Sequence, residues 1–428
     1  MKKMPVPHDQ AKRIAERLTR GRDVSGLPDL LAPTPESERS LPPPVPRQVD
    51  WSEEAAEERI NFLEARGNSL DHLKGSRPLP DREILRTRIE NFIGMAQIPV
   101  GVIGPLRING LHASGDFYVP LATSEGALVA SCNRGAGLLS RAGGAATLTT
   151  IEHVQRAPGF VFRRMAESAL FALWASEAFP RFVEIAKEET THGQLLDLSV
   201  QIQANHVYLI LDFHTGDAAG QNMVTFCTAA ICEYILQHSP YQPSSWFVES
   251  NMSGDKKATA LGFSRTRGRN ATAEAVIPRE LLRKILRTTP ECMCEYWRLS
   301  FIGGVQTGSI GVSGHLANSL AALFIACGQD VACVSEASVG LTRLETTSDG
   351  DLYAMVNLPN LIVGTVGGGT ELPTAQECLR IMGCEGEGTA AKFAEICAAV
   401  ALGGELSIIG ALCANEFSKA HRKLGRKR

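Results

Sequence analysis

The sequence predicts an α+β protein with more than one domain, and three observations lead to this fold class. The chain has 428 residues, which is too long for one simple core. Its composition, with 44% hydrophobic and 21% charged residues, is that of an ordinary globular protein. Between residues 160 and 250, helix-like segments stand beside strand-like ones, which favours a compact α+β unit.

The N-terminal region begins with a polar lead-in and continues with helices. Residues 1–50 end in the proline-rich "LAPTPESERSLPPPVPRQVD", which cannot bury a core and is expected to be flexible or extended. A helix is expected in "DWSEEAAEERINFLEARGN", with Ser52 as its cap and acidic residues in its first turn. A second helix is expected in "DREILRTRIENFIG", ending at Gly94. Residues 51–94 therefore form the expected helical region.

The middle of the chain changes from strands to a helix and then to a mixed unit. Short apolar runs with Gly and Pro in "IPVGVIGPLRINGLHASGDFYVPLAT" predict strands and turns. Apolar positions at helical spacing in "SEGALVASCNRGAGLLSRAGG" predict a closely packing helix opened by Ser124. The segment "MAESALFALWASEAFPRFVEIAKEE" predicts a helix, and "DLSVQIQANHVYLILDFHTG" predicts strands.

The C-terminal half is expected to be mostly helical. Helices are predicted in "PRELLRKILRTTPECMCEYWRLS" and over the whole of "GSIGVSGHLANSLAALFIACGQD". The segment "DLYAMVNLPNLIVGTVGGGT" predicts a strand that runs into a glycine loop. A last helix, "TAAKFAEICAAVALGGELSIIGALCANEFSKAH", leads into a basic tail.

Charge, hydropathy and cysteine spacing exclude several classes of protein. A net charge of -3 argues against nucleic acid as the main partner. The N-terminus lacks an apolar signal region, and the best membrane candidate, "ICAAVALGGELSIIGALCA", is interrupted by glycines and Glu405. The eleven scattered cysteines include one close pair, Cys292 and Cys294, whose spacing does not suit zinc. We expect a cytoplasmic protein with reduced core thiols and no metal, membrane or nucleic-acid partner.

Three charged residues have local contexts that allow a chemical role. Glu125, among small apolar residues at a helix start, is either a protonated general acid or a glutamate favoured by the helix dipole. Asp330, at the end of an apolar helix, is either exposed or paired with a lysine. The loop "ESNMSGDKKATA" places Lys256 where no periodicity explains it, so it is either a solvated turn or part of a site.

Two glycine-containing motifs could approach a ligand. The segment "GTVGGGT", residues 364–370, lets the backbone come close to a ligand or a strand, but it matches neither the Rossmann nor the Walker pattern. In "GDAAGQNM", residues 216–223, Asp217 could cap a helix whose N-terminus faces an anion, or simply cap a helix.

In their residues and in their order along the chain, these motifs resemble those of one family, the 3-hydroxy-3-methylglutaryl-CoA reductases of the class shared by eukaryotes and archaea. The resemblance covers about residues 80–421 and includes "ENFIGMAQIPVGVIGPL", "ATSEGALVASCNRG", "GDAAGQNM", "DKK", "GSIG", "IACGQD", "GTVGGGT" and "GELS". It implies a large acyl-CoA-binding α/β domain with a central helix over 95–162 and 248–415. It also implies a ferredoxin-like dinucleotide-binding domain inserted at 163–247, and a basic C-terminal flap over 416–428.

The resemblance further implies a reaction in which two hydride transfers from NADPH reduce hydroxymethylglutaryl-CoA to mevalonate and free CoA. Lys256 then corresponds to the cation that stabilises the oxyanion, and Asp330 to the carboxylate that links it to the acid Glu125. Glu125 protonates the aldehyde oxygen, and His421 protonates the departing thiolate. These four residues are the expected catalytic set.

The resemblance also assigns binding residues and an assembly. The expected substrate-binding residues are Asn251, Asp255, Lys257, His315 and Asn318. The expected cofactor-binding residues are Asp217, Gly220, Asn222, Gly364, Thr365, Val366, Gly367 and Gly368. Active sites are expected between two subunits of a homodimer or homotetramer.

Several positions depart from the family pattern. Val161, Leu299 and Val334 stand where the family has an arginine, a lysine and an asparagine, and Glu249 replaces a serine. His214 replaces the arginine that commonly contacts the 2'-phosphate of the cofactor. Two alternatives therefore stay open: the same chemistry on a less acidic acyl-CoA, and a CoA-binding homologue without turnover. Retention of all four catalytic residues argues against the second.

Overall fold

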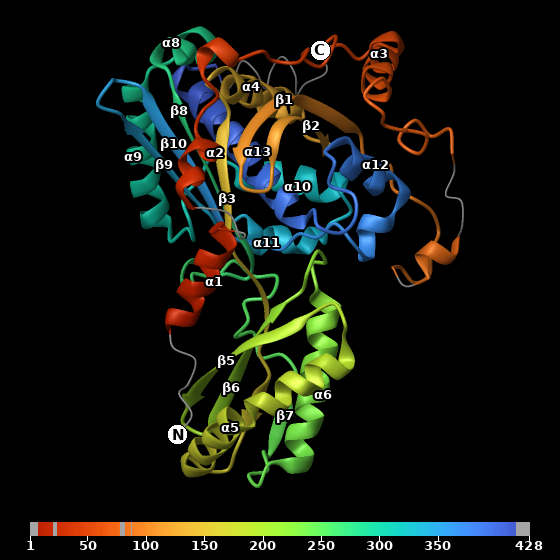
Figure 1. Ribbon diagram of the computed structural model, residues 1–428, viewed down its shortest axis with the longest axis vertical. Helices are drawn as coiled ribbons and strands as arrows, with labels where there is room; N and C mark the ends of the chain where they lie inside the picture. Colours follow the sequence, from red (N-terminus) through yellow and green to blue (C-terminus); the bar gives the residue numbers. More distant parts are fainter. Residues whose placement is uncertain (1–6, 20–23, 78–81, 87, 417–428) are drawn as a thin grey trace.

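The structure is a computed structural model that describes residues 7–19, 24–77, 82–86 and 88–416. Two lobes are visible, a large one with most of the helices and a smaller one built from α5, α6 and strands that include β5, β6 and β7 (Figure 1). The long strand β3, Ala145–Arg156, belongs to the sheets of both lobes. Helices and mostly antiparallel strands occur in both, which confirms the α+β fold class.

The sheet of the large lobe has the strand order β2-β1-β3-β8-β10-β9. Its strands besides β3 are β1 Val100–Gly110, β2 Ser114–Ala122, β8 Gly268–Ile277, β9 Leu341–Thr346 and β10 Leu352–Leu361. All neighbouring pairs are antiparallel except β1 with β3. The strands predicted around residues 100–122 and before the glycine loop are therefore confirmed.

The small lobe has the βαββαβ order of a ferredoxin-like unit. Its elements are β4 Gly159–Val161, α5 Met165–Glu189, β5 Gln194–Gln203, β6 His206–His214, α6 Gln221–His238 and β7 Ser245–Phe247. The sheet order is β7-β4-β6-β5, and every pair is antiparallel. The end of β3 pairs with β6, which joins this sheet to the large one.

A central helix, α13 Ala390–Cys413, forms the core of the large lobe. It packs on α4 Leu128–Arg141 so closely that a Cβ at Gly135 would lie 1.9 Å from the carbonyl oxygen of Gly403. Among the described helices, α13 alone is long and apolar enough to span a membrane, but 83% of its most apolar window is buried in the protein. Its apolar character is thus explained by the core.

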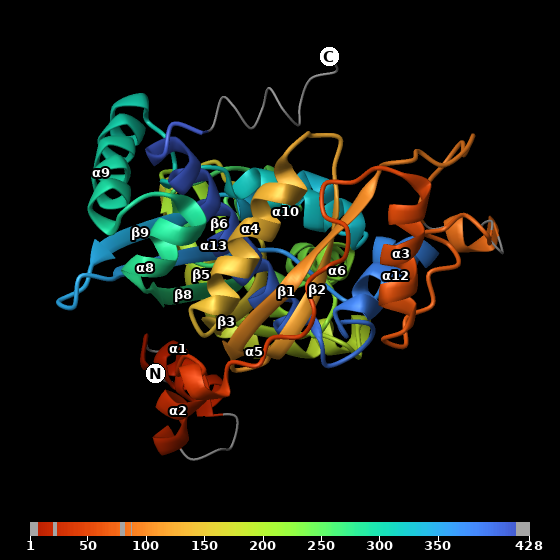
Figure 2. The same cartoon turned by 90° about the horizontal axis from the view of Figure 1, so that it is seen from above.

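Shorter helices surround this core. They are α7 Leu261–Ser264, α8 Arg279–Leu281, α9 Pro290–Thr307, α10 Leu316–Ala326, α11 Val334–Ala337 and α12 Pro373–Ile381. Single turns occur at Val331–Cys333 and Gly368–Glu371, and a π-helical turn at Leu282–Leu286. Seen from above, α9 lies at one edge of the lobe and α12 near the opposite edge (Figure 2).

The N-terminal region wraps around the large lobe. It contains α1 Pro7–Thr19, α2 Leu27–Leu31 and α3 Glu53–Glu64, with single turns at Val24–Gly26, Glu36–Glu38 and Arg82–Leu85. The predicted cap of α3 is confirmed, because the Ser52 hydroxyl accepts a hydrogen bond from the Ala55 amide at 3.2 Å. The Tyr118 hydroxyl donates to the Pro43 carbonyl at 2.6 Å, which holds the proline-rich segment against β2.

Three helix predictions are wrong in extent. The helix expected in 81–94 is only the turn Arg82–Leu85, because residues such as Ile93 have no surface to pack against and stay exposed. The helix expected from residue 308 begins only at Leu316, after a loop. The helix expected over 278–300 is divided at Arg287, whose φ of 56° ends the first part before Thr289 caps α9.

Candidate active site

The Asp-Lys-Lys loop is held in a strained conformation that brings Lys256 to Asp330. Asn251 and Lys256 have φ values of 65° and 55°, which are uncommon for residues other than glycine. Lys256 Nζ lies 2.7 Å from Asp330 Oδ2, and this hydrogen bond raises the pKa of Lys256. The lysine partner predicted for Asp330 is thus present.

The position of Asp330 differs from the prediction in one respect. Helix α10 ends at Ala326, and Asp330 instead caps the following turn, where its Oδ1 accepts a hydrogen bond from the Ala332 amide at 3.1 Å. Asp330 therefore lies at the start of a turn and not, as the sequence predicts, at the end of the helix. A carboxylate at the start of a turn is locally favoured and needs no lysine.

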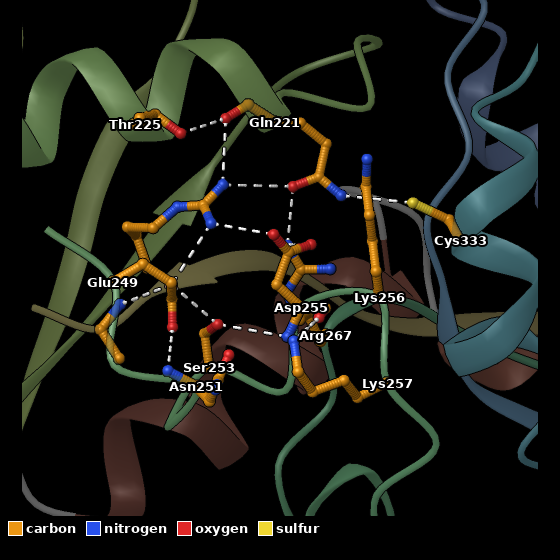
Figure 3. Close-up of polar contacts among 12 residues, drawn as sticks. Gln221, Thr225, Glu249, Asn251, Ser253, Asp255, Lys256, Lys257, Arg267 and Cys333 are labelled. Atoms are coloured by element: carbon orange, nitrogen blue, oxygen red, sulfur yellow. Dashed lines mark hydrogen bonds and ion pairs between the residues drawn. The ribbon is translucent and has the colours of Figure 1, made fainter.

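Two buried arginines, Arg156 and Arg267, hold the loop by ion pairs, and Figure 3 shows Arg267 beside Asp255. Arg156 Nη1 lies 3.2 Å from Glu249 Oε2 and 2.9 Å from Asp255 Oδ2. Arg267 Nη2 lies 2.8 Å from Asp255 Oδ1, and its Nη1 donates to both oxygens of Glu336 at 2.7 Å. The Lys256 amide also donates to Glu336 Oε1, at 3.1 Å. This ion-pair network fixes the backbone from which Lys256 projects.

The carboxylates of Asp255 and Glu249 both form ion pairs within this network. Burial raises the pKa of Asp255, but Arg267 and Arg156 outweigh burial and hold it below its usual value. Glu249 accepts hydrogen bonds from the Asn251 amide at 2.6 Å and the Ser253 hydroxyl at 3.0 Å, besides its pairing with Arg156. Both carboxylates therefore organise the loop, and Glu249 is not a free negative charge in the substrate pocket.

The other two predicted residues at this loop are open to solvent. Asn251 and Lys257 are exposed, and Lys257 Nζ donates to the Asp255 carbonyl at 2.9 Å. The side chains of Lys256 and Asp330 are 42% and 37% exposed. The loop thus presents a cationic surface rather than a closed, water-poor site.

Glu125 lies elsewhere, with Asn318 as its partner. Asn318 Nδ2 donates to Glu125 Oε2 at 2.7 Å. His315 precedes α10, and Asn318 stands three residues later, on the same helical face. Helix α4 begins only at Leu128, so Ser124 is not its cap, and Glu125 is exposed rather than buried among apolar residues.

The two pairs lie at opposite ends of α10. Asn318 is in its first turn and Asp330 follows its last residue, Ala326; residues 318–326 span about 12 Å along the helix axis at 1.5 Å per residue. No hydrogen bond or ion pair among the described residues connects Glu125 to Lys256. One chain therefore presents two half-sites: the acid half-site of Glu125, His315 and Asn318, and the lysine half-site of Lys256 and Asp330. His421 lies outside the described residues.

The nucleotide motifs touch each other between the lobes. Asp217 accepts hydrogen bonds from the amides of Gly388 at 2.7 Å and Ala390 at 3.0 Å, so it caps α13 rather than α6. The Asp217 carbonyl accepts from the Thr365 amide at 2.8 Å. A Cβ at Gly364 would lie 2.5 Å from the Ala219 amide nitrogen, so glycine is required for this contact. Asp217, Gly364 and Thr365 are thus parts of the scaffold.

The remaining nucleotide residues are accessible. Gly220, with φ of 73°, precedes α6, whose N-terminus has no side-chain cap, and Asn222 is exposed in its first turn. Val366 and Gly367 are half-buried and Gly368 is exposed. Uncapped amides at a helix N-terminus suit a phosphate, so this region can accommodate a dinucleotide.

The positions that depart from the family pattern have different surroundings. Val161 lies in β4, and Val334 begins α11. Leu299 is 69% exposed on α9. The His214 ring lies 3.7 Å from Glu152, which also pairs with Arg17 of α1 at 3.0 Å.

A cavity of about 980 Å³ adjoins Glu125. Its walls come from the proline-rich segment, β1, α4 and the turn after α8, and they include Pro43, Trp51, Asn133, Arg134 and Lys284. Arg134 is fixed by the Ser407 carbonyl of α13 at 2.8 Å. The cavity is large enough for a sizeable ligand, and its lining includes four cationic residues and two acidic ones, Asp50 and Glu125.

Sequence reasoning missed the residues that hold the two half-sites. Arg156, Arg267 and Glu336 were not singled out. Arg267 lies in the polar segment "SRTRGRN", so no local pattern marks it as part of a buried ion pair. Within the described ranges, no group of three or more His, Cys, Asp or Glu could hold a metal ion.

Comparison with known proteins identifies the family. The family model described as hydroxymethylglutaryl-coenzyme A reductase matches residues 55–426. The 3-hydroxy-3-methylglutaryl-coenzyme A reductase of Pyrococcus abyssi is 43% identical over 87% of this chain and 93% of its own length. That of Methanocaldococcus jannaschii is 40% identical over 89% and 96%.

Solved structures show the same fold. A class II 3-hydroxy-3-methylglutaryl-CoA reductase from Streptococcus pneumoniae, solved with NADPH, matches with a TM-score of 0.66 and 19% identity, over 83% of this chain and 86% of that one. The family match spans most of the chain and includes both half-sites and both nucleotide motifs. This chain therefore belongs to the hydroxymethylglutaryl-CoA reductase family.

Proposed function

We propose that this protein reduces hydroxymethylglutaryl-CoA to mevalonate and free CoA with two equivalents of NADPH. The observation that carries the proposal is the Lys256–Asp330 pair, at 2.7 Å, on a loop held in a strained conformation by buried ion pairs. Its hydrogen bond to Asp330 raises the pKa of Lys256, so the amine stays charged at neutral pH. A fixed ammonium is the group that a developing alkoxide needs.

The proposed chemistry follows from these residues. The bound NADPH supplies the hydride in each step. In the first step, Lys256 neutralises the oxyanion formed at the thioester carbon, and the carbon–sulfur bond then breaks. The departing thiolate takes a proton, a role we assign to His421. In the second step, the aldehyde oxygen takes a proton from Glu125 as its carbon receives the hydride.

The cofactor would lie where the two lobes meet. The uncapped start of α6 at Gly220–Asn222 offers backbone amides to a phosphate, and Val366, Gly367 and Gly368 line the opposite side. Asp217, Gly364 and Thr365 would hold these two walls together rather than touch the cofactor. We keep the division into a catalytic domain and a nucleotide domain at 163–247 as part of this proposal.

The CoA portion fits the cavity beside Glu125. Its volume of about 980 Å³ is in the range of pockets for large ligands. Arg134 and Lys284 can meet phosphate groups, and the exposed ring of Trp51 can stack on a base. The thioester end would then point toward Glu125.

Two copies are needed to complete each site. Within one chain the acid half-site and the lysine half-site lie at opposite ends of α10, and Glu125 and Lys256 are both exposed. Exposed apolar residues accompany both, with Ile310 before α10 and Val331 beside Asp330. In a two-fold dimer, the acid half-site of one subunit can meet the lysine half-site of the other, which gives two complete sites. We propose such a homodimer, alone or within a homotetramer.

The compartment follows from the cysteines. All eleven are free in the structure, and nine of them are buried. Unpaired thiols in this number suit a reducing compartment, and we propose the cytoplasm.

The central test measures NADPH oxidation with hydroxymethylglutaryl-CoA in the wild type and in Lys256→Ala. We expect turnover in the wild type and at least about a 100-fold lower kcat in the variant. Circular dichroism and the oligomeric state serve as controls for folding. A correctly assembled Lys256→Ala protein with substantial activity would contradict the role of this lysine.

The shared site has its own test. Glu125→Gln and Lys256→Ala, each inactive alone, are co-expressed with different tags and the mixed dimers are purified. Mixed dimers contain one intact site of two, so we expect about half of the wild-type rate. Purified mixed dimers that remain inactive would show that both half-sites act within one subunit.

A second candidate is the same reduction of a less acidic acyl-CoA. The exposed apolar residues Leu299, Ile302 and Val305 on α9 favour it, because they offer no partner for a carboxylate. Parallel assays with neutral branched acyl-CoAs distinguish the candidates, since the higher kcat/KM identifies the substrate. Turnover of hydroxymethylglutaryl-CoA alone would remove this alternative.

A further inference from the structure

Helix α13 carries two fully buried glutamates that are not in the proposed catalytic set. Glu395 is 0% exposed and Glu405 is 2% exposed. Burial raises the pKa of each to about 7, against the opposing effect of the backbone amides that they bind. Burying a carboxyl group costs free energy, so the groups that each of these glutamates contacts indicate its role.

Glu405 binds the loop that leads into α10. Its Oε2 accepts a hydrogen bond from the Gly314 amide and its Oε1 one from the His315 amide, both at 2.6 Å. The Nδ1 atom of the His315 ring lies 3.8 Å from the same Oε1. This nitrogen is buried and has no hydrogen-bond partner, while 10% of the side chain remains exposed. The accessible edge of the imidazole is therefore the one away from Glu405.

The shape of α13 also fits His315. A Cβ at Gly404 would lie 3.0 Å from His315 Cε1 and 2.7 Å from Ser319 Oγ. The absence of a side chain at Gly404 thus allows the ring and the start of α10 to rest directly on α13. Gly404 and Glu405 together determine where the imidazole lies and which edge it presents.

This arrangement connects Glu405 to the acid half-site. His315 and Asn318 lie on the same face of α10, and Asn318 holds Glu125 through the 2.7 Å hydrogen bond described above. A shift of the loop at Gly314–His315 would move the first turn of α10 and with it the contact to Glu125.

We propose that Glu405 is a positioning residue for the acid half-site: it fixes the start of α10 and directs His315 Nδ1 inward, so that the opposite ring nitrogen faces the reacting carbonyl. The inference rests on the proposed function. Because Nδ1 lies 3.8 Å from Glu405 without a hydrogen bond, Glu405 acts on the ring through the Gly314–His315 backbone that it holds. Glu405 itself does not touch the substrate.

Glu395 provides a matched control on the same helix. One of its oxygens, Oε2, accepts hydrogen bonds from the amides of His112 at 2.9 Å and Ala113 at 2.8 Å and from the Thr147 hydroxyl at 3.1 Å. These partners belong to β3 and the β1–β2 turn, at the other end of α13 from the acid half-site.

The test compares Glu405→Gln with Glu395→Gln and with the conservative Glu405→Asp. The assay is reduction of the free aldehyde by NADPH, which needs Glu125 but no thiolate protonation. We expect kcat to fall about 10- to 100-fold in Glu405→Gln, as is typical when a residue that orients another is lost. We expect Glu405→Asp to recover part of this loss and Glu395→Gln to stay within about 2-fold of wild type. Thermal unfolding identifies variants that fail to fold.

A double-mutant cycle with His315→Gln separates positioning from general stability. Because Glu405 acts partly through His315 and partly through the start of α10, Glu405→Gln should cause a smaller further loss of kcat in the His315→Gln background than in the wild type. Multiplicative losses, or equal effects of Glu405→Gln and Glu395→Gln on folded protein, would overturn the inference.

A pH profile gives an independent readout, with His315 and Tyr296 of α9 as the titratable groups near Glu405. We expect the profile of Glu405→Gln to differ in shape from that of wild type, and an unchanged shape would count against positioning. Failure of the proposed function is recognised separately, because the wild type would then reduce neither the thioester nor the aldehyde.

Discussion

Replacing Glu249 by serine, the residue of the family pattern, separates two opposite views of this position. As a free charge in the substrate pocket, Glu249 would repel an acidic acyl group, and Glu249→Ser would improve the KM. The contacts in the structure predict instead that Glu249→Ser brings no improvement in the KM. Glu249 joins Arg156, the Ser253 hydroxyl and the Asn251 amide, all within 3.2 Å. Its removal should loosen the loop that carries Lys256.

The size of the effect follows from these contacts. Hydrogen bonds to a charged group contribute about 1.5–3 kcal/mol. In the variant, Arg156 still pairs with Asp255 at 2.9 Å, so the charge of the arginine is not left unpaired. The loss of unfolding free energy should therefore stay near the lower end of that range. We expect Glu249→Ser to lose about 2 kcal/mol of unfolding free energy and to lower kcat, with no gain in KM for hydroxymethylglutaryl-CoA.

Denaturant unfolding and steady-state NADPH oxidation measure both quantities. Glu280→Ser is the control, because Glu280 is an exposed glutamate whose loss removes the same charge and little structure. A stable Glu249→Ser variant with a lower KM for the acidic substrate would refute the structural role and restore the view that this glutamate repels substrate.

Three further predictions follow from individual contacts. In Asp330→Asn, Lys256 loses the negatively charged hydrogen-bond acceptor that raises its pKa, so the alkaline limb of the kcat/KM profile should move to lower pH; an unchanged limb would show that Asp330 does not set that pKa. The pKa of Glu395 is about 7 in the folded protein and 4.5 in the unfolded chain, so the stabilisation from its protonated form is complete below pH 4.5 and is lost as pH rises to 7. Glu395→Gln should reduce the fall in unfolding free energy over this pH range by on the order of 3 kcal/mol. Equal pH dependence of the unfolding free energy of the two proteins, measured by urea unfolding, would contradict this. Lys284→Ala should raise the KM for the acyl-CoA about 3- to 10-fold, whereas Arg283→Ala, a neighbour outside the cavity, should not. Equal KM values for the two variants, in preparations shown by calorimetry to be equally folded, would exclude CoA from this cavity.

The sequence by itself determined the parts of the protein that depend on neighbouring residues. The cap of α3 at Ser52, the strands β1 and β2 and the helix-and-strand content of the small lobe all follow from local patterns of polarity, glycine and proline. The motifs also placed the chain in its family, because they record residue types in order. A periodic apolar pattern forms a helix, however, only where the segment has a surface to pack against. The helix expected before Gly94 therefore does not form.

Only the tertiary structure decided which charged groups are used for structure and which are left for chemistry. Asp217 caps α13 from 173 residues away, and Glu405 holds the His315 loop from 90 residues away. No local pattern distinguishes such carboxylates from those that face substrate, because an ion pair is chosen by burial and geometry across the fold. The same holds for Glu125 and Lys256, whose partners Asn318 and Asp330 lie at opposite ends of α10 and are not recognisable as such from the sequence alone.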